Sequence, residues 1–547
     1  MRLSPVVLAL LPGLAASSAY AAVYQVQELP EVTSVRSQFA AAMNDNGDVV
    51  GSASFIYDFP VDIDKLDFEN STLSTSFTED EIAQIKQGNV DAEALTILLS
   101  YLSSNSTNYE LQRYSDVQAF NYSAGTQVKV RETAEVPTNR EYIYDINASG
   151  NVLALATTTF TQQSFTPAAT DSTPSPATVD LWVPDEAHIK SYIMNGSTKT
   201  ALPIPYEDLG GGFSVANKIS NGNYIAGSGS VGLLDDTYTS IEDSCDGSAQ
   251  PISICYYTFA TNSNYIERAL VWKLNDSGQI SAPEQYGYLG PKIDGTEETS
   301  YVSRALSVND SGIAVGYSTY TDEERSIYVS HATVYDNKEV AAIVDPLEWD
   351  TSSAVDINNG NIVVGNASKV INGSSRNKFF VFDYNTNTVT FPTDFFTSSN
   401  SVPHAINDNN MVVGAAEVIP DDSTSRRQVA FLYDMSNSTF TDLNTLLPCS
   451  SSVDLVEAVD INNNNEIVAN AVIAVEQRDA KGELVKDSAG NPVMENVSRP
   501  VKLVPVANGT IEDCNAEQDL TYERKGGSAS WFSLLLLPLL YLRRRAQ

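Results

Sequence analysis

Oxygen-rich turns are the segments of this sequence whose residue types come closest to a metal site. Two of them are Asn44-Asp45-Asn46-Gly47-Asp48 and Asn309-Asp310-Ser311-Gly312. Carboxylate and amide oxygens are ligands that Ca²⁺ prefers, so calcium binding at these turns would be chemically reasonable. The sequence lacks the spacing of an EF-hand, in which a Glu closes the loop, and related turns carry Asn where these carry Asp. We therefore expect no cofactor, and calcium stays as the alternative.

The residue types that catalyse most reactions form no recognised motif in this chain. HExxH, GxSxG, P-loop and dinucleotide-binding glycine patterns are all absent. The three histidines, His188, His331 and His404, have no base or acid beside them in the sequence that would complete a catalytic group. His331 and His404 lie near repeated segments, from which each could face a central channel. We predict no catalytic residues and favour a binding protein over an enzyme.

A nine-residue pattern that occurs seven times contains the oxygen-rich turns and sets the framework around the histidines. Each copy has an apolar residue, usually Asn, a turn, an apolar pair, and then Gly or Ala; Ser220 is the departure at the second position. The copies span 43–51, 146–154, 219–227, 308–316, 357–365, 406–414 and 461–469. Their turns contain Gly47, Gly150, Gly222, Gly312 or Gly360, and Asn410 or Asn465 where Gly is missing. Gly and Asn accept positive φ at little cost, so each copy predicts a β-hairpin.

The spacing of the copies predicts the fold. The last four copies begin 49, 49 and 55 residues apart, which matches a four-stranded propeller blade of about 50 residues. Aromatic and β-branched runs such as 119–122, 180–182, 379–382 and 430–433 predict further strands, whose aromatic residues we expect between blades. We predict an all-β, seven-bladed β-propeller, closed by C-terminal strands 500–513 beside the N-terminal hairpin. An open solenoid, which small-angle scattering would reveal as elongated, is the alternative.

Non-repeating segments interrupt the early units at 52–117, 157–178 and 228–267. In the first, a capping box from Thr78 to Glu81 and the apolar run 92–102 predict a small helical insertion. The second is rich in Thr, Ser and Pro, which is typical of a flexible loop. Residues 475–498 predict a charged hairpin or loop. We interpret the insertions as decorations of single blades, with a lid or partner-binding cap as the alternative for 52–117.

Charge and cysteine content narrow the partners and the compartment. The formal net charge of −37 and the isoelectric point of about 4.2 disfavour nucleic acid and anionic lipid as partners. Four cysteines in an exported chain favour disulfides. Three pairings are open, and we favour Cys245–Cys255 together with Cys449–Cys514. No Cys or His spacing predicts a zinc site.

Both ends of the chain have the composition of targeting segments. Residues 1–21 predict a signal peptide with cleavage between Ala21 and Ala22. The propeller domain would span 22–515, followed by a linker at 516–530. Residues 531–547 combine an apolar run with a basic end, which predicts a sorting or transmembrane segment. The basic end would stay in the cytoplasm, so the rest of the protein would lie outside it. A tail that packs on the fold is the alternative.

Two resemblances agree with this interpretation. The repeat, with Ala-x-Asp-Ile-Asn before the turn, resembles the HAF-type extracellular repeat family; the name triplet is partly kept, as His331-Ala332-Thr333, Ala119-Phe120 and Ala430-Phe431. That resemblance implies a secreted bacterial repeat protein without an assigned activity.

The tail, with Gly526-Gly527-Ser528, a Leu-rich run and Arg543 to Arg545, resembles the GlyGly-CTERM sorting signal. It implies processing near Gly526 to Ser528 by a rhomboid-like protease (rhombosortase) in a Gram-negative bacterium.

These observations together predict a surface-associated or secreted binding or structural module with unknown ligand. Its partners would be signal peptidase, the sorting protease and the export machinery. It would be anchored in the inner membrane as a precursor and then released to the cell surface or the medium. A hydrolase or lyase acting on extracellular glycan or peptide at the central face is the alternative.

Overall fold

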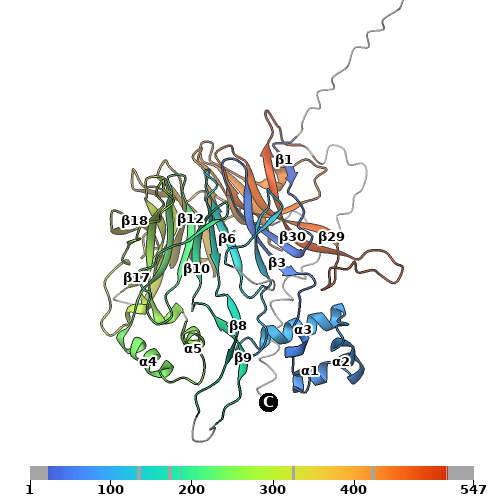
Figure 1. The fold of residues 1–547 in the computed structure, drawn as a ribbon. Coiled ribbons are helices and arrows are strands. Elements are labelled where there is room, and N and C mark those ends of the chain that lie inside the picture. Colours follow the sequence, from blue (N-terminus) through green and yellow to red (C-terminus); the bar gives the residue numbers. More distant parts are fainter. Residues whose placement is uncertain are drawn as a thin grey trace, which may run out of the picture.

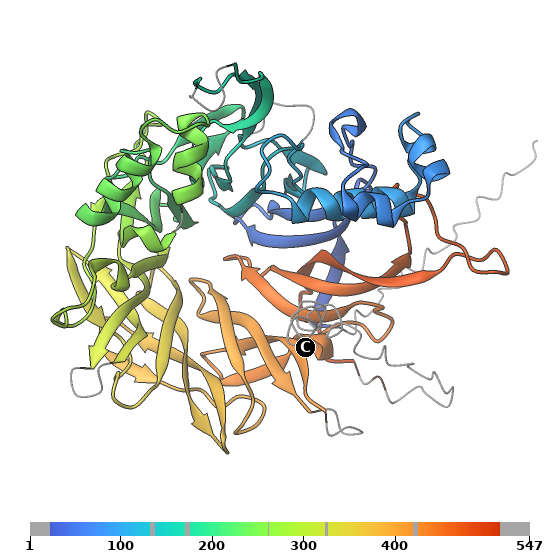
Figure 2. The same ribbon diagram turned by 90° about the horizontal axis from the view of Figure 1, so that it is seen from below.

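The computed structural model describes residues 22–131, 137–169, 175–186, 188–260, 262–322, 327–419, 425–512 and 514. Within them, seven four-stranded antiparallel sheets surround a central axis as the blades of a β-propeller (Figures 1 and 2). The predicted seven-bladed architecture is therefore confirmed. The expected signal peptide at 1–21 and the expected segments at 516–530 and 531–547 lie outside the described residues.

Each blade starts with the strand nearest the axis. The first three blades are β2 (Val35–Met43), β3 (Val49–Ile56), β4 (Val117–Asn121) and β5 (Thr126–Val128); β6 (Glu141–Ile146), β7 (Val152–Ala156), β10 (Lys190–Asn195) and β11 (Thr198–Ala201); and β12 (Ser214–Ile219), β13 (Tyr224–Leu233), β14 (Tyr265–Lys273) and β15 (Glu284–Gln285).

The next three blades have the same strand order and only short connections. They are β16 (Ser303–Val308), β17 (Ala314–Asp322), β18 (Ile327–Asp336) and β19 (Glu339–Ala342); β20 (Thr351–Ile357), β21 (Ile362–Ile371), β22 (Ser374–Asp383) and β23 (Thr388–Thr390); and β24 (Ser401–Ile406), β25 (Met411–Val418), β26 (Arg427–Asp434) and β27 (Thr439–Asp442).

The seventh blade joins the two ends of the chain. Its strands are β28 (Asp454–Ile461), β29 (Ile467–Glu476), β30 (Met494–Pro505) and β1 (Tyr24–Glu28). β1 pairs antiparallel with β30, with Tyr24 opposite Pro505. The ring is closed, as expected, but the N-terminal partner of β30 is β1 and not the first repeated hairpin.

The repeated hairpins are the two inner strands of every blade. Every inner strand carries a β-bulge, for example between Ala354 and Asp356. The bulge brings the carbonyl of Ser353 so close to Gly365, the ninth residue of its repeat, that a Cβ there would lie 2.2 Å from that oxygen. Small residues at the ninth position thus permit close approach of two strands within a blade.

The left-handed residue of each hairpin turn is the fifth of the repeat. Gly47, Gly150 and Gly312 occupy it as expected, and so do Asn410 and Asn465. In two blades the sequence suggested Gly222 and Gly360, but the residues with positive φ are Asn223 and Asn361, each at φ 62°. Asn is thus preferred over an adjacent Gly, and the side-chain contacts of these residues explain why.

Long insertions all leave the ring between the second and third strands of a blade. They share one side, opposite the hairpin turns; we name this side the insertion face and the side of the hairpin turns the turn face (Figures 1 and 2). The first insertion holds η1 (Ile63–Lys65), α1 (Ser71–Ser76), α2 (Glu79–Ile85) and α3 (Ala92–Ser104) around a core of its own. The predicted capping box is present, because Thr78 accepts from the Glu81 amide and Glu81 accepts from the Thr78 amide.

The other two insertions differ from their expected structures. β8 (Phe160–Phe165) and β9 (Val179–Pro184) form a separate two-stranded sheet, so 180–182 is no blade strand and 160–165 is no loop. The third insertion contains α4 (Asp235–Cys245), α5 (Ile252–Phe259) and η2 (Asn262–Asn264), and Cys245 is bonded to Cys255. Elsewhere η3 (Glu298–Ser300) and η4 (Leu443–Leu446) connect blades, and Cys449 is bonded to Cys514. Both favoured disulfides are thus present.

Apolar side chains fill the spaces between neighbouring blades. Trp272, Phe379, Phe380 and Phe431 are completely or almost completely buried in these layers. The aromatic residues of the third strands therefore serve packing, as expected. Their burial holds the seven inner strands at a fixed distance from the axis, which sets the geometry of the channel.

Candidate functional site

The seven hairpins enclose a small polar cavity on the axis. Its volume is ≈ 120 Å³, and its walls are the first three residues of the repeats together with the residue before them in four blades. Because all these positions come from one repeated hairpin, their side chains form layers around the axis. Two layers of hydrogen bonds and one cluster of charges follow from this arrangement.

A ring of asparagines joins the blades at the second position of the repeat. Asn407 is typical: its Oδ1 accepts from the amides of Asn409 (3.1 Å) and Met411 (2.9 Å), while its Nδ2 donates to Asn462 O (2.9 Å) and Asn465 Oδ1 (2.7 Å). One amide thus shapes its own turn and binds the next blade.

The same donation from one blade to the next recurs around the ring. It runs from Asn44 to Asn147, Asn147 to Ser220, Asn309 to Asn358, Asn358 to Asn407, Asn407 to Asn462, and from Asn462 back to Asn44. The side chain of Ser220 has no amide nitrogen, so the chain of side-chain donors is interrupted after blade three. The left-handed Asn223, Asn361, Asn410 and Asn465 accept from the preceding blade, a role that Gly could not fill.

A second layer lies at the mouth of the cavity, at the third position. The backbone amide of Asn359 donates to Asp408 Oδ1 (2.8 Å). The backbone amide of Asp408 donates to Asn463 Oδ1 (2.9 Å), and the backbone amide of Asn463 donates to Asp45 Oδ1 (2.9 Å). Asp310 accepts in the same way from the amide of Gly222. Carboxylates and amides at the mouth are therefore engaged with neighbouring blades.

Three buried carboxylates and one lysine form the floor of the cavity. Asp145, Asp356 and Asp460 each accept the first backbone amide of the next blade's repeat, at 2.7, 2.9 and 2.8 Å. Lys218 Nζ lies 3.6 Å from Asp145 Oδ1 and 3.9 Å from Asp460 Oδ1. The Lys218 side chain is 29 % exposed, so the cluster is in contact with the cavity.

Burial and mutual charge shift the pKa values of this cluster. Burial raises the pKa of Asp145, and it raises the pKa of Asp460 to about 6, against the opposing effect of Lys218. Burial alone would lower the pKa of Lys218, but the three carboxylates together raise it. Lys218 therefore stays charged and compensates part of the negative charge of the floor.

The two turns considered for calcium have their carboxylates occupied by protein donors. Asp45 accepts from Asn463 and Asn221, Asp48 accepts from Asn44, and Asp310 accepts from Gly222. Within the part of the chain that the structure describes, no group of three or more His, Cys, Asp or Glu side chains could hold a metal ion. The turns thus have a structural role that accounts for their oxygen-rich composition.

The histidines lie away from the cavity walls. His331 is completely buried in β18, with Nδ1 3.1 Å from Ser352 Oγ, and burial lowers its pKa to about 4. His404 is on an inner strand, but its Nδ1 contacts Ala458 O of the next blade at 2.9 Å. His188 is buried against Tyr265 and Phe213, and burial lowers its pKa to about 4 as well. Neither His331 nor His404 is among the residues that line this cavity.

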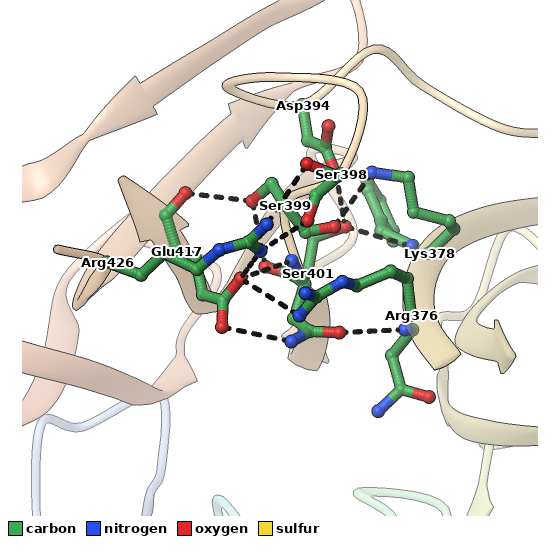
Figure 3. Close-up of polar contacts among 11 residues, drawn as sticks. Arg376, Lys378, Asp394, Ser398, Ser399, Ser401, Glu417 and Arg426 are labelled. Atoms are coloured by element: carbon green, nitrogen blue, oxygen red, sulfur yellow. Dashed lines mark hydrogen bonds and ion pairs between the residues drawn. The ribbon is translucent and has the colours of Figure 1, made fainter. Parts of the chain in front are cut away.

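On the insertion face, an ion-pair network joins blades five and six (Figure 3). Glu417 accepts from Arg426 Nη1 (2.6 Å) and from Asn400 Nδ2 (3.0 Å), and Lys378 Nζ lies 2.6 Å from Asp394 Oδ2. Burial alone would raise the pKa of Glu417, but the hydrogen bonds from Arg426 and Asn400 lower it. The network fixes these blades at a place where the insertion face has no insertion.

Similarity to known proteins adds a family to this geometry. A sequence model of the family described as "Protein of unknown function (DUF3466)" matches residues 2–545. The chain belongs to this family. Membership extends over the whole propeller and both ends of the sequence. A search of curated proteins found no match.

Solved structures with a similar fold share little sequence with this member of the DUF3466 family. Dipeptidyl peptidase 4 of Porphyromonas gingivalis is 8 % identical over 66 % of this chain and 48 % of its own, with a TM-score of 0.32, so this chain spans about half of its length. The β-propeller domain of the trilobed protease from Pyrococcus furiosus is 9 % identical over 59 % and 75 % of the two chains, with a TM-score of 0.30. TolB from Acinetobacter baumannii is 10 % identical over 73 % and 79 %, with a TM-score of 0.28.

The floor cluster and the inter-blade role of Asn are the features that sequence reasoning missed. Asp145, Asp356 and Asp460 directly precede a repeat, so their alignment was visible, but only the closed ring shows that they meet. No helix among the described segments is long and apolar enough to cross a membrane. The predicted membrane segment at 531–547 lies outside them.

Proposed function

We propose that this protein is an exported β-propeller that acts as a binding or structural module and holds its ligand on the insertion face. The observation that carries this proposal is the division of labour between the two faces. The turn face uses its polar groups to join blades, whereas the insertion face carries every long non-repeating segment. Function is commonly placed on loops that a rigid scaffold positions.

The turn face offers a ligand few free groups. Its asparagine amides and mouth carboxylates already bond to neighbouring blades, as at Asn407 and Asp408. The cavity behind them, at ≈ 120 Å³, is much smaller than the pockets of several hundred Å³ that bind drug-sized ligands. A ligand there would have to replace bonds that hold the ring together.

The insertion face offers a varied and strongly acidic surface. Residues 57–116 contain twelve acidic and three basic residues, and residues 228–264 contain five acidic and no basic residues. Most of these carboxylates are exposed on α2, α3 and α4 or their flanking loops. Such a field disfavours nucleic acid and polyanionic glycans as partners.

No observation favours the alternative of a hydrolase or lyase at the central face. Neither a His nor an Arg of the described residues lines the central cavity. The carboxylates of the floor accept backbone amides of neighbouring blades, which is a structural use. We keep the binding role as the proposal.

Export and processing complete the proposal. Signal peptidase would cut between Ala21 and Ala22, and a rhomboid-like sorting protease would cut near Gly526, Gly527 and Ser528 after insertion of 531–547 in the inner membrane. The intact mass of the protein recovered from the surface or medium of a Gram-negative host tests this. A product that retains Arg545 would contradict the processing step.

A ligand screen with structural mapping tests the binding role. The purified protein is applied to arrays of glycans and peptides, and hydrogen exchange is then measured with and without each ligand that binds. We expect protection within 57–116, 160–184, 235–259 or 477–493. Protection confined to the hairpin turns, for example 407–411 and 462–466, would overturn the assignment to the insertion face.

A further inference from the structure

A groove opens on the insertion face where the ring closes. Its volume is ≈ 120 Å³, and its walls come from the loop between β1 and β2, the end of β3, and the β29–β30 hairpin. The polar residues in these walls include Tyr57, Arg478, Arg499, Glu31 and Glu476; Val32, Val35 and Val475 provide apolar parts. Segments far apart in sequence build this groove, so it exists only in the closed propeller.

Two arginines of the groove, Arg478 and Arg499, form no ion pair with a carboxylate of the described residues, although the chain has a net charge of −37. Arg478 donates Nη1 to Gly482 O (2.7 Å), and Arg499 donates Nη1 to the carbonyls of Arg36 and Ser498. Neither guanidinium forms an ion pair with a described carboxylate, whereas the adjacent Arg36 is paired with Glu495. Each therefore keeps donors in the geometry that suits a carboxylate.

Tyr57 lies in the field of these cations. Burial and Glu495 raise the pKa of Tyr57, while Arg36, Arg499 and Arg478 oppose that shift. All three guanidinium groups are thus close enough to act on one phenol. The hydroxyl of Tyr57 adds a neutral donor to the charged ones.

Two exposed apolar side chains, Phe55 and Met494, are on β3 and β30, strands that also contribute to the walls of the groove. Phe55, two residues before Tyr57, is 53 % exposed at φ 62°, a conformation that disfavours a bulky residue. Met494 is 57 % exposed and pairs with Glu476 in the register of β29 and β30. Arg, Tyr, Phe and Met together are typical of binding surfaces.

The hairpin arm at 477–493 holds the groove in shape. The amide of Asp58 donates to Ala480 O (2.8 Å), and Lys481 Nζ lies 2.8 Å from Asp58 Oδ1. Gly482 is packed so closely on the Tyr57 side chain that an added Cβ would lie 3.2 Å from it. The arm, which extends outward from the ring in Figure 2, therefore fixes both Arg478 and Tyr57.

We propose that this groove binds a ligand with a single carboxylate next to an apolar group, with Arg478 and Arg499 as the carboxylate donors and Phe55 and Met494 as the apolar contact. This inference rests on the proposed binding role and deepens it. A single carboxylate matches two free guanidinium groups, while the acidic surroundings repel polyanions. An acylated amino acid or the C-terminus of a short peptide has this chemistry, and an acidic sugar shares only the carboxylate.

Glu31 and Glu476 allow a variant that should strengthen binding, in contrast to the arginine variants, which should weaken it. Both line the groove and would repel a bound carboxylate. Glu476→Gln should therefore strengthen binding, whereas Arg478→Gln and Arg499→Gln should weaken it. A general loss of structure could not produce an effect of both signs.

The experiment measures binding of four small probes to the full-length protein by calorimetry or ligand-observed NMR. The probes are N-acetylphenylalanine, its amide, acetate and glucuronate. We expect N-acetylphenylalanine to bind most tightly and the amide to bind at least tenfold more weakly. If glucuronate binds more tightly than N-acetylphenylalanine, the ligand is an acidic sugar, and the proposed apolar contact is rejected.

Variants complete the test. Arg478→Gln, whose side chain is exposed, should weaken binding of N-acetylphenylalanine at least tenfold, and Glu476→Gln should strengthen it severalfold. Arg427→Gln, an exposed arginine paired with Asp454 in another part of the ring, is the matched control and should have no effect. Equal binding of acid and amide, no binding of any probe at 10 mM, or unchanged binding in Arg478→Gln would overturn the proposal. In each of these cases, an array ligand that still protects the insertion face would leave the proposed function intact.

Discussion

The turn face and the insertion face differ in how the chain uses its polar residues. On the turn face, the second position of the repeat is Asn in six blades, and each amide bonds to the next blade, as Asn407 does to Asn462. On the insertion face, the corresponding connections range from tight loops to the helical segment at 57–116. The same hairpin sequence can serve every blade only where each hairpin makes the same bonds to the next blade. Individual chemistry is thus placed on the side where the connections between strands do not repeat.

The largest expected effect comes from breaking the asparagine ring. Asn407→Ala removes two turn bonds and two inter-blade bonds from a buried site, and we expect a loss of about 3 kcal/mol in the free energy of unfolding. Urea unfolding followed by circular dichroism measures it. Asn437→Ala, in an exposed outer turn of the same blade, is the control and should cost less than about 1 kcal/mol.

Asn407→Asp separates the two roles of this residue. Asp keeps the acceptor of the turn but places a carboxylate against Asn462 O and Asn465 Oδ1. If the inter-blade bonds matter, Asn407→Asp is at least as unstable as Asn407→Ala at pH 7. Stability near that of the wild type would show that only the turn matters.

A second effect, of up to about 3 kcal/mol, concerns pH and the floor of the cavity. Burial raises the folded-state pKa of Asp460 to about 6, above the unfolded value near 3.9, so the folded state binds the proton more tightly. Stability relative to Asp460→Asn should therefore rise as the pH falls from about 6 to 4. Unfolding of both proteins in urea across pH 4–7 measures it. A stability difference that does not change with pH would show that Asp460 has an ordinary pKa.

The smallest effect on the ring should come from the insertion face. Replacing Cys245 and Cys255 together by Ala removes the bond between α4 and α5. We expect faster hydrogen exchange in 235–259 but a change of less than about 1 kcal/mol in unfolding of the propeller, since these helices lie outside the blades. A large loss of global stability would show that the insertion supports the ring, and the contrast between the faces would fail.

The sequence predicted the ring because the ring is made of local repeats. Hairpin turns, strand order and the capping box at Thr78 all follow from neighbouring residues. The sequence did not show that Asn223 and Asn361, and not the adjacent Gly222 and Gly360, have the left-handed conformation. This choice depends on the side-chain oxygens of the two asparagines, which accept hydrogen bonds from the preceding blade. The strand at 180–182 exists, but it pairs with β8 outside the blade, and β10 is the third strand of the blade.

The candidate sites were harder to predict than the fold. Asp145, Asp356, Asp460 and Lys218 meet only because four different blades point to one axis. The groove at Tyr57 depends on β1, β3 and the β29–β30 hairpin, which are brought together by closure of the ring. Spacing along the chain carries no signal for such contacts, and only the Asp directly before three of the repeats marks the floor in the sequence.

The pairing of β1 with β30 sets the order in which the molecule can be completed. β1 is the first of the described strands, yet its partner β30 is the last of them and ends at Pro505. Ala22, next to the predicted cleavage site, is only 3 % exposed and packs against Gly509. The seventh blade can therefore be completed only after all the other described strands have been delivered. A chain that crosses a membrane from its N-terminus would stay open during transit and close only on arrival.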